Sequence, residues 1–204
     1  MKYGFLAFSF VLVTFCTQAF AGNYKVTIDG KVHEVDLGQV NRIVLEDGRE
    51  IEVVVDKKDV LSFEVDNFSF DYPSAFKPTR TDVGDGIYQT MMATPLGSLV
   101  LVQEYTTLDP SHMVDMMVKE LTKEEEQYGY QIETSAVTKV VNGTSFTGKK
   151  AIARYKADKS TRFVFAHGAR DSGLMVITMV DKDAPAEDIA MIQKFWESLT
   201  VTMQ

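Results

Sequence analysis

The three histidines are the side chains of this chain best suited to acid–base or metal chemistry, and they lie far apart at His33, His112 and His167. None occurs in an H-x-x-x-H or H-E-x-x-H spacing, which would place two ligands on one face of a helix. Ser111 precedes His112 directly, but neighbouring residues at a helix start point in different directions and do not form a nucleophile–base pair. The chain also has no G-x-S-x-G nucleophile elbow. These spacings favour a chain without a histidine-based catalytic or metal site.

Two aspartates offer the best carboxylate candidates for a cation. Asp82 and Asp85 enclose Val83-Gly84 in a stretch that resembles part of a calcium loop. The stretch lacks the third acidic position and the closing glutamate of an EF-hand. A turn rich in glycine and aspartate is therefore the preferred interpretation. Asp82 and Asp85 remain candidate ligand-binding residues, together with His112.

Methionines could supply soft thioether ligands. Met113-x-x-Met116 suits Cu(I) in an exported protein. Met113, Met116 and Met117 also fit the buried stripe of a helix, where methionine fills gaps in a core. We favour the buried stripe, keep Met113 and Met116 as candidate metal ligands, and predict no cofactor.

Residues 1–21 have the pattern of a secretory signal peptide. Lys2 carries the only charge, an apolar run follows, and Ala19-Phe20-Ala21 supplies the small residues of a cleavage site. The apolar run of about 12 residues is shorter than the ~20 that a membrane-spanning helix needs. Phe15 before Cys16, the chain's single cysteine, is a poor fit to a lipid-attachment site. We therefore predict export to the periplasm or the exterior, with neither a membrane anchor nor a cysteine left after cleavage.

The charge balance restricts the partners. There are 29 acidic against 21 basic residues, for a formal net charge of −8. Such a balance opposes binding to nucleic acid or to an anionic membrane surface. The expected partner is a protein or a component of the cell envelope. The oligomeric state is left open.

The expected elements form an N-terminal module and a larger domain. Residues 22–59 read as two β-hairpins around Asp29-Gly30 and Asp47-Gly48, a strong turn signal. A module of this size cannot bury a sufficient core alone, so it should pack on the rest of the chain or on a partner. Within the domain at 60–204 we expect helices at about 110–128 and 185–198, a long loop at 73–86, and strands at 61–65, 68–72, 87–93, 99–105, 137–141, 151–155, 162–166 and 174–180.

Runs of strands without βαβ alternation indicate an α+β fold, with two main helices packed on an antiparallel sheet. The strand at 174–180 is almost continuously apolar, which predicts a central position covered on both faces. A hairpin should turn at Asn142-Gly143. The helix at about 110–128 should begin after Asp109-Pro110 and end at Gly129.

Three motifs of core and turn residues lie within about 60–204. They are Phe68-x-Phe70-x-Tyr72-Pro73-x-x-Phe76, Gly148-x-x-Ala151-x-x-x-Tyr155 and Phe195-x-x-Ser198-Leu199-x-Val201. Together they resemble the PsbP-like superfamily, which includes PsbP and DcrB-type periplasmic proteins. The resemblance implies an antiparallel sheet with helices on it and a non-enzymatic binding or assembly role. No functional residue carries over, because no binding motif is shared.

The sequence therefore favours an exported, non-enzymatic binding or accessory protein that engages its partner through the sheet face, the 73–86 stretch or the N-terminal hairpins. Two alternatives remain open. One is a hydrolase or other enzyme with a site assembled from scattered histidines and carboxylates. The other is a structural domain whose hairpins pair with the sheet edge of another chain.

Overall fold

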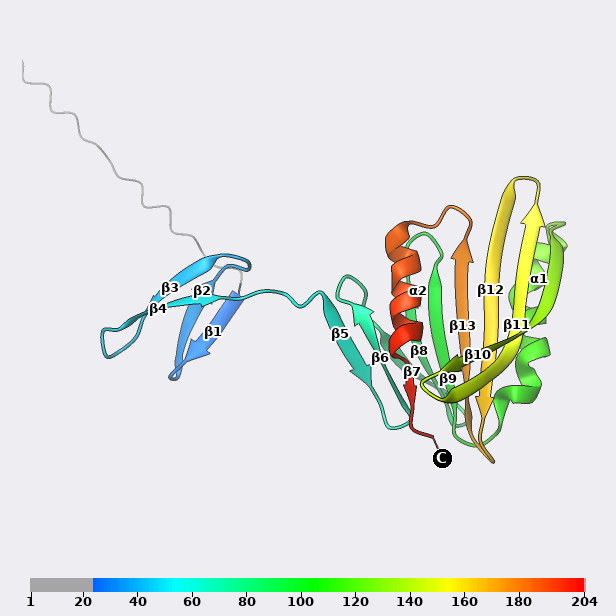
Figure 1. Cartoon of the computed structure of the whole chain (residues 1–204), viewed down its shortest axis with the longest axis horizontal. Coiled ribbons are helices and arrows are strands. Elements are labelled where there is room, and N and C mark those ends of the chain that lie inside the picture. The colour runs from blue at the N-terminus through cyan, green and yellow to red at the C-terminus, as the bar shows by residue number, and fades with distance from the viewer. Residues whose placement is uncertain (1–23, 204) are drawn as a thin grey trace, which may run out of the picture. The chain divides into compact units, whose positions relative to one another are not determined.

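The computed structural model describes residues 24–203, and these divide between Lys57 and Lys58 into two compact units (Figure 1). The expected signal peptide at 1–21 lies outside the described residues and stays a prediction, as do the expected domain boundaries. Within residues 24–203, no helix is both long and apolar enough to cross a membrane.

The N-terminal unit consists of two antiparallel hairpins, as the Asp-Gly pairs predicted. At the first turn both Asp29 and Gly30 have positive φ, 48° and 81°. The second turn is longer, and there only Gly48 has a positive φ. Val35 and Ile43 are the unit's fully buried apolar side chains within the described range. The four strands are β1 (Tyr24–Ile28), β2 (Lys31–Val35), β3 (Val40–Val44) and β4 (Glu50–Val54).

The C-terminal unit is built on a seven-stranded antiparallel sheet, which confirms the α+β fold class. Its strand order is β10-β11-β12-β13-β9-β8-β7. A second sheet of three strands has the order β14-β6-β5. The bounds are β5 (Val60–Glu64), β6 (Phe68–Pro73), β7 (Thr79–Gly84), β8 (Ile87–Ala93), β9 (Leu99–Tyr105), β10 (Gln131–Val141), β11 (Thr144–Tyr155), β12 (Asp158–Gly168), β13 (Gly173–Asp181) and β14 (Thr200–Val201).

Strand β13 is the central strand of the sheet, and its residues 173–178 are all buried. Alternate side chains of a strand point to opposite faces. Leu174 and Val176 belong to a core cluster with Met191 and Phe195. Met175 and Ile177 belong to a second cluster with Val118 and others. The predicted coverage of this strand on both faces is therefore confirmed.

Two α-helices, α1 (Val114–Gln127) and α2 (Ala186–Ser198), supply these two clusters. A short 3-10 helix, η1 (Pro110–Met113), precedes α1, and the side chain of Asp109 accepts a hydrogen bond from the Ser111 N–H at 2.8 Å. The predicted start after Asp109-Pro110 is thus confirmed, with a 3-10 turn first. At the other end of α1, Gly129 has a φ of 88°, a conformation that glycine adopts readily.

The expected loop at 73–86 is wrong, because strand β7 lies within it and pairs with β8 at the edge of the sheet. Pro78, Gly84 and Gly86 are loop signals, but here they stand next to the strand or at its last residue. An edge strand pairs on one side only and tolerates a proline beside its start. Arg80 of β7 further ties it to the sheet through an ion pair with Glu104 of β9 at 2.6 Å.

Candidate ligand-binding groove

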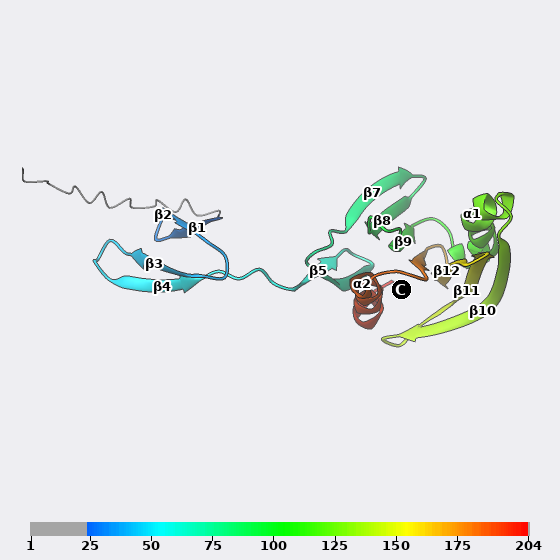
Figure 2. The ribbon, with the colours of Figure 1, turned by 90° about the horizontal axis from the view of Figure 1, so that it is seen from above.

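The two helices cover different parts of the seven-stranded sheet. Helix α1 packs mainly on β11, β12 and β10, whereas α2 packs on β6, β13 and β9. Figure 2 shows α1 and α2 on opposite sides of the sheet, with the β10–β11 hairpin curving toward the side of α2. On that side, the surface of β10–β12 is therefore flanked by α2 without being covered by it.

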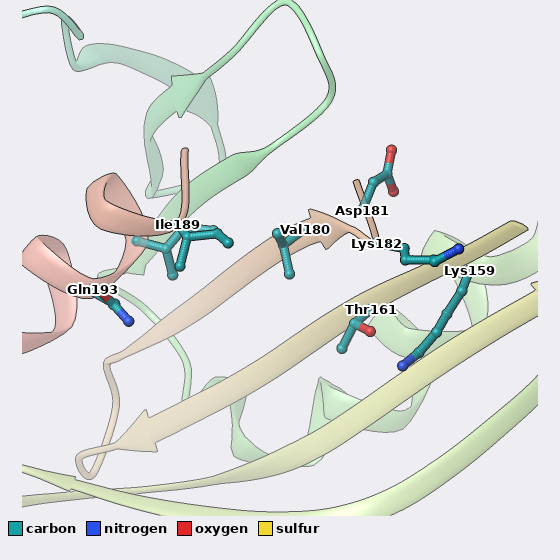
Figure 3. A pocket seen from close by; sticks show the side chains of 8 residues that line it. Lys159, Thr161, Val180, Asp181, Lys182, Ile189 and Gln193 are labelled. Atoms are coloured by element: carbon teal, nitrogen blue, oxygen red, sulfur yellow. The ribbon is translucent and has the colours of Figure 1, made fainter. Parts of the chain in front are cut away.

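A cavity of about 360 Å³ opens between the start of α2 and the ends of β12 and β13 (Figure 3). Val180 and Thr161 lie between the side chains of α2 and two lysines in this view. The volume is within the range of small-ligand pockets, ~300–1,000 Å³. Its lining consists of Lys159, Thr161, Val180, Asp181, Lys182, Ile189, Ile192 and Gln193.

A second cavity of about 180 Å³ adjoins the first, since Ile192 lines both. Its lining consists of Lys139, Phe163, Phe165, Thr178, Ile192 and Trp196. Both cavities lie on the α2 face of β12 and β13, where Thr161, Phe163 and Phe165 follow one another at every second position. We call the two together the aromatic groove.

The floor of the aromatic groove is a packed set of rings. Phe163 and Phe165 stack at 5.9 Å between centroids with an angle of 1° between their planes. Trp196 of α2 meets Phe165 edge to face at 5.2 Å. Phe165 and Trp196 are buried, while Phe163 is only half-buried. Such rings offer a large apolar contact area with little side-chain freedom to lose.

A glycine allows the strands under the groove to approach closely. Gly148 of β11 pairs with Phe165 of β12. A Cβ at this position would lie 2.0 Å from the Val164 backbone oxygen, far inside contact distance. Only glycine therefore fits between the two strands here, which gives this residue of the Gly148-x-x-Ala151 motif a structural role.

Four lysines surround the aromatic floor. The Lys139 ammonium lies 5.0 Å from the Trp196 ring centroid, and that of Lys150 lies 5.5 Å from the Phe163 centroid. Lys159 and Lys182 line the first cavity. Among residues 24–203, none of these four lysines forms an ion pair. Two of them, Lys139 and Lys150, lie over ring faces instead.

Asp181 is the one carboxylate that lines the groove cavities. Burial raises the pKa of Asp181, and the nearby carboxylates of Asp158 and Glu125 raise it further, while Arg162 acts in the opposite direction. Glu125 is itself engaged with Arg162 through two hydrogen bonds of 2.6 and 2.7 Å. The local field therefore disfavours the ionised form of Asp181.

The candidate ligand-binding residues Asp82 and Asp85 both lie where β7 turns into β8. Asp82 accepts a hydrogen bond from the Gly84 N–H at 2.9 Å, and Asp85 has a φ of 53° in the β7–β8 turn. This is the glycine–aspartate turn expected from the sequence. Within the described residues, no group of three or more histidine, cysteine or acidic side chains could hold a metal ion.

The buried methionine stripe predicted for α1 is partly wrong. Met116 is 57% exposed, while Met113 and Met117 pack partly buried against the core. The buried stripe of α1 instead follows Val114, Val118 and Thr122. In α1 the buried positions recur every four residues from Val114, and Met116 lies between them on the opposite side of the helix.

Near the start of α1, three of the candidate polar residues act on one carboxylate, that of Asp109. The Ser111 hydroxyl donates to Asp109 at 2.5 Å, and this bond is the main cause of a lowered pKa at Asp109. His112 and His167 lower it further through their charge. The Ser111 hydroxyl thus bonds a carboxylate rather than an imidazole, and none of the three lines either groove cavity.

Comparison with known proteins gives structural similarities alone. No protein-family model matches the chain, and no curated protein matches it in sequence. A crystal structure from Bacteroides thetaiotaomicron is similar over 70% of this chain, with 14% identity and a TM-score of 0.42. The match covers 48% of that protein, so this chain spans about half its length.

The solution structure of cyanobacterial PsbP from Synechocystis is also similar, over 70% of this chain and 92% of that one. The protein of that structure is a PsbP, and the sequence motifs within about 60–204 resemble the same superfamily. At 10% identity and a TM-score of 0.46, this similarity supports no inference about what the chain binds.

The aromatic groove could not be predicted from the sequence. Its signal was present in the alternation of Thr161, Phe163 and Phe165, which puts two aromatic side chains on one face of a strand. No local pattern shows that α2 leaves this face of β12 partly uncovered. The groove depends on the position of a helix that begins some twenty residues later.

Proposed function

We propose that this chain is an exported, non-enzymatic binding protein and that the aromatic groove is its binding surface. The observation that carries the proposal is the half-buried Phe163 ring, which lies partly uncovered beside α2, next to the buried rings of Phe165 and Trp196 and with lysines around it. Binding sites are commonly concave and apolar, with a few polar groups that fix orientation. The signal-peptide pattern supports export, and the PsbP-like motifs support a binding role.

The side chains of the groove suit binding better than catalysis. The lining of the two cavities has no histidine and no nucleophile held by a base. Its polar groups are lysines, threonines, a glutamine and one aspartate. Such a set orients an apolar ligand through charge and hydrogen bonds.

The proposal is tested with N-phenylnaphthylamine, a neutral apolar dye that fluoresces when it leaves water. Trp196 is the only tryptophan of the chain and lines the groove, so energy transfer from it reports dye in that place. We expect saturable energy transfer from Trp196 to the dye in the intact protein. In Ile189→Asp the dissociation constant of the dye should rise at least tenfold. Ile189 is 42% exposed, so this variant should fold.

Met91→Asp is the matched control, because Met91 is 39% exposed on β8, outside the groove. This variant should bind the dye as the intact protein does. Dye binding that is absent, or that survives Ile189→Asp and is lost in Met91→Asp, would overturn the assignment of the groove.

A further inference from the structure

The lining of the aromatic groove carries more basic than acidic side chains, unlike the chain as a whole. The formal net charge of the chain is −8, whereas the two groove cavities and their flank hold four lysines and one aspartate, Asp181; Asp158 and Asp183 lie with Lys182 around an adjoining hollow. Lys139, Lys150 and Lys159 are half-buried and lack an ion pair within the described residues. A partly desolvated ammonium without a counter-charge gains more from an anionic partner than an exposed one does.

The lysines lie at both ends of the apolar floor. Lys159 and Lys182 line the cavity at the start of α2 (Figure 3). Lys139 lies over Trp196 in the second cavity. Between the two ends, the floor is formed by Thr161, Phe163 and Phe165. Lys150 pairs with Phe163 across the strands and flanks the middle of the floor.

The length of the floor sets the size of its occupant. From Lys159 to Phe165 the chain runs along one strand, and at a rise of ~3.3 Å per residue this distance is roughly 20 Å. An extended peptide of about six residues spans the same length. Alternate side chains of such a peptide would face the aromatic floor, and acidic residues at its two ends would reach Lys159 and Lys182 at one end and Lys139 at the other.

Resting on the function proposed above, we infer that the aromatic groove binds an extended, amphipathic protein segment with acidic residues at both ends and aromatic or aliphatic residues between them. A fatty acid of the same length fits less well. Its single carboxylate would satisfy one group of lysines and leave its apolar end beside the other. Charge at both ends of the floor therefore favours the peptide.

The test uses two synthetic peptides and palmitate, with quenching or shift of Trp196 emission as the readout. Both peptides alternate phenylalanine and serine in the middle; one carries aspartates at both ends and the other carries lysines. We expect the acidic peptide to bind at least tenfold more tightly than the basic one. The double variant Lys139→Gln/Lys159→Gln should weaken it about tenfold, because each removed contact is worth roughly a factor of three to ten.

Lys123→Gln on α1 is the matched control, since Lys123 lies outside both groove cavities and should leave the affinity unchanged. Equal binding of the two peptides, or unchanged affinity in the double lysine variant, overturns the inference. Binding of palmitate but not of the acidic peptide also overturns it and identifies a single-carboxylate ligand instead. If neither peptide binds while N-phenylnaphthylamine still does, the peptide inference fails and the groove assignment stands; if none of them binds, both fail.

Discussion

Two regions of the seven-stranded sheet lie outside the main helix contacts, and their side chains differ in kind. On the α2 face, the aromatic groove has stacked rings and lysines that form no ion pair within residues 24–203. On the α1 face, β8 and β9 carry a polar chain in which the Tyr105 hydroxyl donates to Gln103 at 2.9 Å and the Gln103 amide donates to Gln89 at 3.4 Å. We call this second region the glutamine surface.

The two surfaces differ in how far their side chains satisfy one another, and therefore in how favourably each can bind a ligand. Side-chain amides that bond each other on neighbouring strands satisfy part of their own hydrogen-bonding capacity. The half-buried Phe163 ring beside ammonium groups that form no ion pair within residues 24–203 leaves apolar area and charge to be matched by something else. The groove rather than the glutamine surface is therefore expected to respond to a ligand.

The largest expected effect is a loss of stability from a substitution in α2 where the helix covers the sheet. Met191 of α2 is 0% exposed and belongs to the main core cluster. Met191→Ala should lower the free energy of unfolding by about 2–5 kcal/mol, because it leaves a cavity in a packed core. Urea denaturation measures this. A loss below about 1 kcal/mol would show that α2 is loosely held, and the comparison of covered and open regions would fail.

The next effect concerns the ion pair beneath the three-stranded sheet. Glu104 is buried, contacts the Asn67 side chain and pairs with Arg80. Glu104→Gln keeps the shape and removes the charge, so we expect a loss of about 1–3 kcal/mol in unfolding free energy, since Arg80 loses its partner. Asp115→Asn is the control, because the Asp115 side chain is 73% exposed in its ion pair with Lys149. Comparable losses in the two variants would contradict the buried role of Glu104.

Removing Phe163 should separate stability from binding. The ring is half-buried, so Phe163→Ala should cost less than Met191→Ala, about 1–2 kcal/mol, while dye binding in the groove should be lost. Gln89→Ala on the glutamine surface should keep dye binding. Paired urea and fluorescence titrations measure both quantities. If Phe163→Ala binds the dye normally, the aromatic floor is only a part of the core.

A pH-dependent effect is expected at the start of the helix that covers the α1 face. The hydrogen bond from Ser111, followed by the charges of His112 and His167, lowers the pKa of Asp109. A lowered carboxyl pKa stabilises the fold above the unfolded value of about 3.9, and this contribution is lost as the pH falls through the folded value. Asp109→Ala should therefore cost about 1 kcal/mol near neutral pH and progressively less in acid. If the loss of unfolding free energy in Asp109→Ala stays constant as the pH falls, the ionised Asp109 carboxylate does not stabilise the start of the helix.

The smallest effect is expected at the single aspartate of the groove. Asp181→Asn removes a negative charge beside Lys159 and Lys182, so the acidic peptide should bind roughly threefold more tightly. The basic peptide should gain nothing. Weaker binding of the acidic peptide by this variant would show that Asp181 holds the lysines in place rather than opposing an anionic ligand.

The fold could be predicted further than the site. The alternation of apolar residues and the Asp-Gly and Asn-Gly turns predicted the strands, the hairpins and the central strand at 174–180. Asp109-Pro110 and Gly129 predicted the limits of the first helical segment. These are local signals with local physical causes, namely positive φ at turns, capping at helix ends and side-chain periodicity.

The edge strand β7, the exposure of Met116 and the aromatic groove could not be predicted from the sequence. Strand β7 was missed because Pro78, Gly84 and Gly86 signal a loop, while its ion pair to Glu104 joins residues far apart in sequence. Met116 is exposed because it stands two residues from buried Val114 in α1, on the side of the helix that faces away from the sheet. The aromatic groove requires the position of α2 relative to β12, a tertiary relation that no single segment encodes.

The most direct test of the central claim is a titration of the acidic peptide into nitrogen-labelled protein, followed by amide chemical shifts. We expect the shifts to concentrate on residues 159–165 of β12 and 189–196 of α2, with residues 87–103 at the glutamine surface unaffected. Shifts that concentrate on the glutamine surface, or that are absent from both groove segments at saturation, would contradict the account.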